Sequence, residues 1–135
     1  MIRRFSHATI YVLDQESAKR FYTEKLGFET RSDVTAEGFR WLTVAPPDQP
    51  DLEIILAEPR PPMFDAETAE QFRQLIAKGA FGAGVMRTDD CQGAFRELSA
   101  RGVVFLQEPA ERPYGVEAVF RDESGNWFSL TQRRD

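Results

Sequence analysis

The 135-residue sequence has the size of one domain, and its 41% hydrophobic and 29% charged residues are typical of a globular protein. The net charge of −5 argues against nucleic acid as a partner, because binding a phosphate backbone requires a concentrated basic surface. No apolar run reaches the ~18 residues of a membrane span, no signal peptide is visible, and a single cysteine excludes an intramolecular disulfide. We therefore expect a cytoplasmic protein without a membrane partner. The terminal arginine pairs, Arg3-Arg4 and Arg133-Arg134, are expected to be solvated tails.

The first elements predicted along the chain are a strand, a helix and three further strands. Residues 4–12 alternate between two faces in the manner of a strand. A helix follows between Asp14, which is expected as its N-cap, and Gly27, which is expected to end it. The later strands are expected near residues 28–34, 38–45 and 51–57.

The second half of the chain repeats this order, since residues 83–134 can be laid over residues 7–58. A proline-rich linker at 58–62 and a helix over 65–78 separate the two repeats. Asp90 takes the place of Asp14 as the expected N-cap. The elements predicted in the second half are a strand at 82–88, a helix at 91–101 and strands at 103–107, 115–121 and 126–132.

These elements predict an α+β protein built from two βαβββ repeats. We divide it into repeat one at residues 1–58, a linker and helix at 59–79 and repeat two at 80–135, all within a single domain. One βαβββ unit leaves one face of its sheet uncovered. Two units placed edge to edge would form a cupped mixed sheet, with the helices outside and a concave ligand site inside.

Five segments carry a recognisable pattern: residues 6–14, Phe21-Tyr22, residues 26–28, residues 88–90 and residues 120–127. Through them the sequence resembles the vicinal-oxygen-chelate superfamily, which includes glyoxalase I, bleomycin-resistance proteins and extradiol dioxygenases. The resemblance covers nearly the whole chain and implies the two-repeat fold described above. It leaves the chemistry open, because one fold hosts many functions.

Metal-dependent members of that superfamily draw ligands from the first and last strands of both repeats, which in repeat one implies His7 and Glu53. The corresponding positions in repeat two are Ala83 and Ser129, or Gly82 and Phe128 if the repeat slides by one residue. Neither pair offers a metal donor, whereas a catalytic zinc site keeps three protein ligands and a ferrous dioxygenase needs two His and one carboxylate. We therefore expect no cofactor. The alternative is a Zn, Ni, Mn or Fe ion held by His7 and Glu53 with further ligands from Glu117, Asp122 or a second chain.

His7 and Glu53 are also the two candidate catalytic residues. His7 has three open roles: a neutral imidazole hydrogen-bonded to Glu53, an acid–base or ligand-binding group, or a metal ligand. Glu53 lies between Leu52 and Ile54, where burial would favour its neutral form and suit a general base. The alternative for Glu53 is a carboxylate at a solvated rim, or one paired with Arg40.

Strand alternation predicts which side chains line the cup together with His7 and Glu53. Tyr114 lies in the segment 112–115, which we expect to be a loop that covers the site. An inward Arg87 would hold an anionic group, whereas an outward one would be an exposed arginine at a strand end. The candidate ligand-binding residues are Thr9, Tyr11, Trp41, Arg87, Tyr114, Trp127 and Ser129, with Ile55, Val85 and Thr131 also inward.

Three functions remain open at this point. The one we expect is a metal-independent, homodimeric protein similar to the bleomycin-resistance branch, which sequesters an aromatic or cationic small organic ligand. The second is a metal-dependent lyase, isomerase or dioxygenase that uses His7 and Glu53. The third is a structural or regulatory dimer whose cup has no ligand.

Overall fold

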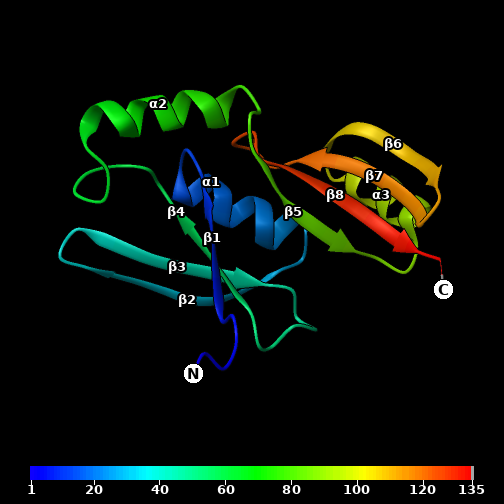
Figure 1. The fold of residues 1–135 in the computed structure, drawn as a ribbon, viewed down its shortest axis with the longest axis horizontal. Coiled ribbons are helices and arrows are strands. Elements are labelled where there is room, and N and C mark those ends of the chain that lie inside the picture. Colours follow the sequence, from blue (N-terminus) through cyan, green and yellow to red (C-terminus); the bar gives the residue numbers. More distant parts are fainter. Residues whose placement is uncertain (135) are drawn as a thin grey trace. The chain divides into compact units, whose positions relative to one another are not determined.

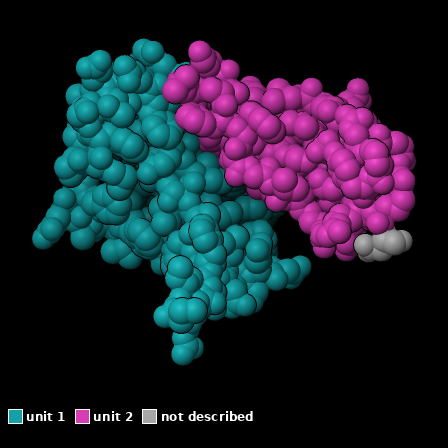
Figure 2. Space-filling model, viewed as in Figure 1, with its two compact units in different colours: residues 1–74 teal, residues 75–135 magenta. Residues whose placement is uncertain are grey.

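The first repeat forms a four-stranded mixed sheet with one helical segment on it. The computed structural model describes residues 1–134 and divides the chain into two compact units, residues 1–74 and the part from Leu75 onward (Figures 1 and 2). In the first unit the sheet order is β1-β4-β3-β2, with β1 parallel to β4 and the other pairs antiparallel. Its elements are β1 (His7–Tyr11), α1 (Gln15–Arg20), the π-helix η1 (Phe21–Lys25), β2 (Glu29–Ala36), β3 (Phe39–Ala45) and β4 (Glu53–Ala57).

The second repeat has the same order of elements and the same kind of sheet. Its strands follow the order β5-β8-β7-β6, with β5 parallel to β8, and α3 packs against β6, β7 and β8. The helix α2 (Ala66–Ala77) precedes it, as the sequence predicts. The other elements are β5 (Gly82–Arg87), α3 (Cys91–Ala100), β6 (Val104–Arg112), β7 (Gly115–Arg121) and β8 (Trp127–Arg133). This arrangement confirms the predicted α+β class with two βαβββ repeats.

Both helices of the repeats begin at the predicted aspartates. The Asp14 carboxylate accepts a 2.8 Å hydrogen bond from the backbone N–H of Ser17, and Asp90 accepts a 2.9 Å bond from that of Gly93. Each bond satisfies a donor that the first turn of a helix leaves unpaired. The first helix differs from prediction, because its second half is a π-helix in which the N–H of Leu26 bonds to the carbonyl of Phe21.

The second repeat also differs from prediction at the segment 112–115. Strand β6 continues to Arg112, which pairs with Gly115, so this segment is the tight turn of a hairpin. Gly115 is required there, because a Cβ atom would lie 2.0 Å from the carbonyl oxygen of Gln132. The C-terminal arginines are not a solvated tail either: Arg133 belongs to β8, and Arg134 forms a 2.5 Å ion pair with Glu111.

The hydrophobic core of each unit lies between its sheet and its helix. Strand alternation directs one apolar row of each sheet toward the helix, as the sequence predicts. No helix within residues 1–134 has the length and apolar character needed to cross a membrane. The buried apolar residues include Ile10, Val12, Ala18, Phe21, Tyr22, Leu42, Val44, Ile54 and Leu56 in the first unit, and Cys91, Val103, Ala118, Phe120, Phe128 and Leu130 in the second.

Candidate functional site

The two candidate catalytic residues of the first unit lie directly opposite each other. His7 pairs with Glu53 across the parallel strands β1 and β4, and Nε2 of the imidazole is 3.6 Å from Oε2 of the carboxylate. That distance is longer than a hydrogen bond. Nδ1 of His7 lies 2.8 Å from the Ser6 hydroxyl, and Glu53 accepts a 2.6 Å hydrogen bond from the Thr43 hydroxyl. The structure therefore brings His7 and Glu53 together and gives each a different hydroxyl partner.

Glu53 is half-buried, with 32% of its side chain exposed. It does not pair with Arg40, which points to the helix side of the sheet. Arg40 instead forms ion pairs of 2.8 Å with Asp33 and 2.9 Å with Glu16. The hydrogen bonds from Arg40 and Lys19 hold the pKa of Asp33 far below its ordinary value. The expected alternative of a Glu53–Arg40 pair is therefore wrong, because two other carboxylates occupy the guanidinium.

Trp41 is the third predicted residue at the His7 pair. Its ring centroid lies 5.9 Å from that of His7, and 37% of the residue is exposed. Tyr11, at the far end of β1, belongs to an aromatic cluster instead: its ring lies 4.9 Å from Phe72 and 5.6 Å from Phe64. Thr9 lies between His7 and Tyr11 on β1, where it pairs with Ile55 of β4. His7, Glu53 and Trp41 thus form one group, and Tyr11 packs in another.

The second unit has a sheet face that points away from α3. Residues Leu130 and Gln132 turn toward the helix, since the Leu130 carbonyl and the Gln132 side chain accept hydrogen bonds from Cys91. Ser129 and Thr131 therefore lie on the opposite face, where their hydroxyl oxygens are 3.1 Å apart. We call this opposite side the open face. It comprises Val85, Arg87, Glu117, Val119, Arg121, Trp127, Ser129, Thr131 and Arg133, of which Ser129 and Thr131 are buried between their neighbours.

Glu117 is the main polar residue of the open face. Its carboxylate accepts a 2.5 Å hydrogen bond from Ser129 and a 2.9 Å bond from the Tyr114 hydroxyl, and Arg112 lies 3.6 Å away. The Ser129 bond is the largest cause that lowers the pKa of Glu117, and the bond to Glu117 raises the pKa of Tyr114. Sequence reasoning treated Glu117 only as a spare metal ligand. The alternation of β7 around the buried Ala118 was the signal that could have placed it here.

Trp127 occupies the position that corresponds to Glu53 in the other repeat. The Tyr11–Ala57 pair ends the parallel strand pair of the first unit, and the Arg87–Thr131 pair takes the same place in the second. Counting back four residues from each of these pairs reaches His7 and Glu53 in one repeat, and Ala83 and Trp127 in the other. Both predicted alignments of the last strand were therefore wrong, because the offset between β4 and β8 is 74 residues, whereas that between β1 and β5 is 76.

The residues present do not fit a complete catalytic metal site. His7 and Glu53 offer one nitrogen and one carboxylate, and their counterparts Ala83 and Trp127 offer no metal donor. Within residues 1–134 no three His, Cys, Asp or Glu side chains group in a way that would hold an ion. Asp122 is used structurally, since its carboxylate accepts the backbone N–H groups of residues 124–126. A metal-free site remains a prediction from the donor set.

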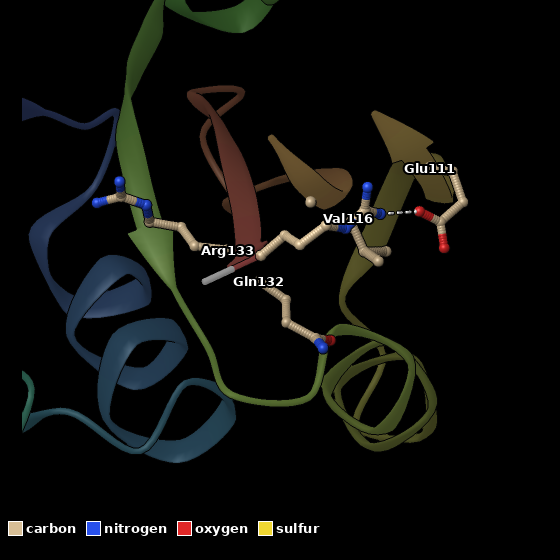
Figure 3. A pocket seen from close by; sticks show the side chains of 6 residues that line it. Glu111, Val116, Gln132 and Arg133 are labelled. Carbon is tan, nitrogen blue, oxygen red and sulfur yellow. Dashed lines mark hydrogen bonds and ion pairs between the residues drawn. The ribbon is translucent and has the colours of Figure 1, made fainter. Parts of the chain in front are cut away.

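A surface pocket of about 260 Å³ lies where β7 begins and β8 ends (Figure 3). None of the predicted site residues lines it. In Figure 3 the Gln132 side chain turns toward α3, whereas the Arg133 side chain extends the other way, across β5. The residues that line the pocket are Glu111, Gly115, Val116, Gln132, Arg133 and Arg134.

Comparison with known proteins places this geometry in a family. Residues 4–130 match the model of the Glyoxalase/Bleomycin resistance protein/Dioxygenase superfamily. The crystal structure of UcmS2 is similar at 55% identity over 98% of this chain and 99% of that one, with a TM-score of 0.94. TnmS3, described as an antibiotic binding protein from Streptomyces sp. CB03234, is 32% identical over 98% of both chains, with a TM-score of 0.78. The YurT protein of Bacillus subtilis is 34% identical over 93% of this chain and 95% of its own.

Proposed function

We propose that this chain, which belongs to the Glyoxalase/Bleomycin resistance protein/Dioxygenase superfamily, binds an aromatic small organic molecule and sequesters it without transforming it. The observation that carries the proposal is the placement of Trp127 on the open face. Its ring lies over Gly82, where a Cβ atom would come within 2.5 Å of the ring. Trp127 remains 37% exposed, and the neighbouring Val85 is 74% exposed.

These two side chains form an apolar surface on which a planar ligand can stack. Burying exposed apolar area against a ligand stabilises the complex by roughly 25 cal/mol per Å² of area removed from water. Aromatic rings add a preference for offset stacked or edge-to-face contact. An aromatic ligand would therefore gain most by covering Trp127 and Val85.

The polar residues around this surface would orient the ligand. A binding site typically combines an apolar lining with a few placed polar groups. On the open face these are Ser129, Thr131 and Glu117, and in the first unit His7 and Glu53 beside Trp41 play the corresponding part. Of the predicted ligand contacts, Arg87, Tyr114, Trp127 and Ser129 belong to the second unit, and Thr9, Tyr11 and Trp41 stay predicted contacts within the first unit.

The comparison with TnmS3 supports a role in binding. That protein is described as binding an antibiotic, and it is similar to this chain over 98% of both sequences. Sequestration requires a site that holds its ligand and leaves it chemically unchanged. The donor set described above supports such a role, because His7 and Glu53 alone fall short of the three ligands of a catalytic metal centre.

The test uses the two tryptophans of the chain as separate reporters. Trp41→Phe leaves Trp127 as the only tryptophan, and Trp127→Phe leaves Trp41. Titration of the Trp41→Phe variant with the neutral aromatic probe biphenyl-4-methanol should quench its fluorescence to saturation, and mass spectrometry should recover the probe unchanged. The proposal is wrong if neither variant responds to the probe, or if the probe is recovered as a different compound.

A further inference from the structure

The open face carries three arginines that no acidic side chain neutralises, and Arg121, the one that pairs with Trp127, is half-buried and donates to the carbonyl of Asp122. Arg87 and Arg133 are exposed, and within residues 1–134 neither forms an ion pair. Other arginines of the protein do have carboxylate partners, among them Arg40 with Asp33 and Arg134 with Glu111. The positive charge of Arg87 and Arg133 is therefore available to a ligand.

Both guanidinium groups belong to the same part of the sheet. Arg87 of β5 pairs with Thr131 of β8, and Arg133 lies two residues further along β8 on the same face. Parallel strands lie about 4.8 Å apart and rise about 3.3 Å per residue, so the two Cα atoms are about 8 Å apart, within the reach of two long side chains. Figure 3 shows the Arg133 side chain extending across β5, the strand that ends at Arg87.

The nearby carboxylate of Glu117 does not cancel this charge. Its oxygens accept hydrogen bonds from the hydroxyl groups of Ser129 and Tyr114, and its ion-pair partner is Arg112. Because these three groups occupy the carboxylate of Glu117, it forms no ion pair with Arg87 or Arg133. An oxyanion would be the natural partner of the pair, since charge-assisted hydrogen bonds from guanidinium groups are among the strongest in proteins.

The open face changes character along the β5–β8 pair. Gly82 and Trp127 begin it, Val85 and Ser129 follow, and Arg87 and Thr131 come next, before Arg133. The distance from Trp127 to Thr131 is about 13 Å at the usual rise of a strand. Along β5 and β8 the face therefore runs from an aromatic end to an exposed cationic end over the length of a small organic molecule, and the half-buried Arg121 of β7 lies beside the aromatic end.

We infer that the ligand is an aromatic oxyanion, such as an aromatic carboxylate, whose ring system covers Trp127 and Val85 and whose acidic group binds Arg87 and Arg133. This inference rests on the proposed function and adds the chemical class of the ligand. It replaces the cationic ligand that the sequence allowed, because an unpaired arginine pair repels a cation.

The experiment compares two probes of nearly equal shape, biphenyl-4-carboxylate and biphenyl-4-methanol, by isothermal titration calorimetry at pH 7. The full-length protein should bind the carboxylate about tenfold more tightly, as expected for one charge-assisted hydrogen bond. The double variant Arg87→Gln, Arg133→Gln should lose this preference and keep its affinity for the neutral probe. The matched control is Arg96→Gln on α3, an exposed arginine on the other side of the sheet, which should keep the preference.

Each outcome bears on a different claim. Equal affinity for both probes would overturn the oxyanion and leave the proposed binding function standing. Loss of the preference in the Arg96→Gln control as well would also overturn it, because net charge alone would then explain the effect. Binding of neither probe would contradict the inference and the proposed function together. Thermal unfolding of each variant verifies that the substitutions leave the fold intact.

Discussion

The hydroxyl of Ser129 donates a 2.5 Å hydrogen bond to the carboxylate of Glu117 across the strands β7 and β8. This bond is the largest cause of the lowered pKa of Glu117, because it favours the ionised carboxylate. Ser129 also lies 3.1 Å from the hydroxyl of Thr131, so the pair belongs to a short polar network on the open face. These hydrogen bonds hold the Glu117 carboxylate in one position on the face that also carries Trp127.

Ser129→Ala should lower the free energy of unfolding by about 1–3 kcal/mol at pH 7, since it leaves an ionised carboxylate without its main donor. The lowered pKa of Glu117 means that its stabilising contribution is present above the ordinary carboxylate pKa and is lost as the pH falls through the lowered value. The difference between wild type and variant should therefore shrink on acidification. Urea unfolding at pH 7 and at more acidic pH measures it. A difference that stays constant with pH would contradict the assignment.

Gly82→Ala should displace the ring of Trp127, because the added Cβ atom would lie 2.5 Å from it. The backbone of Gly82 poses no obstacle, so the substitution acts through the ring contact. In a Trp41→Phe background the emission maximum of Trp127 should shift, and binding of biphenyl-4-methanol should weaken. The control is Gly82→Ala in a Trp127→Phe background, where the emission of Trp41 should not change. An unshifted Trp127 spectrum would show that the ring does not lie over Gly82.

The protein should sediment as a homodimer of twice 15.4 kDa at micromolar concentration. The reason is exposed apolar surface on the β2–β3 hairpin, since Val34 is 60% exposed and Phe39 48%. Clusters of exposed apolar side chains on a folded chain commonly mark an interface with another protein. Analytical ultracentrifugation measures the mass, and a species of 15.4 kDa across the concentration range would contradict the prediction.

Purified protein should contain no stoichiometric zinc, nickel, manganese or iron, and His7→Ala should leave its metal content unchanged. His7 and Glu53 provide only two donors, which is below the three protein ligands of a catalytic zinc site. Elemental analysis by mass spectrometry after growth in metal-supplemented medium measures the content. One equivalent of metal in the wild type that disappears in His7→Ala would place the protein among the metal-dependent members of the superfamily.

The fold was readable from the sequence because its signals are local. Asp14 and Asp90 are N-caps that act within one helical turn, and the alternation of apolar residues marks each strand without reference to the rest of the chain. The two exceptions have the same explanation. The π-helical turn at Phe21–Lys25 and the long β6 strand differ from regular elements only in hydrogen-bond pattern, which residue types do not report.

The site could be predicted from the sequence only in part, because the register between two strands depends on residues that are far apart in the sequence. Residues His7 and Glu53 were paired correctly, since no irregularity interrupts β1 and β4. In the second repeat the last strand is two residues closer in sequence to the first strand than in repeat one, which places Trp127 in the position expected for Ser129. The role of Glu117 was missed for a similar reason, as its partners Ser129 and Tyr114 lie on another strand and in a turn. Contacts of this kind depend on the register between strands, because a shift of one residue would turn every side chain of a strand to the opposite face of the sheet.

The central claim is that an aromatic ligand binds on the open face beside Trp127, and the indole N–H signals of the two tryptophans test it most directly. Trp41→Phe and Trp127→Phe assign the two signals in a ¹H–¹⁵N spectrum of labelled protein. Addition of biphenyl-4-carboxylate should move the Trp127 signal progressively to a saturated position. A Trp127 signal that stays in place throughout the titration would contradict the account.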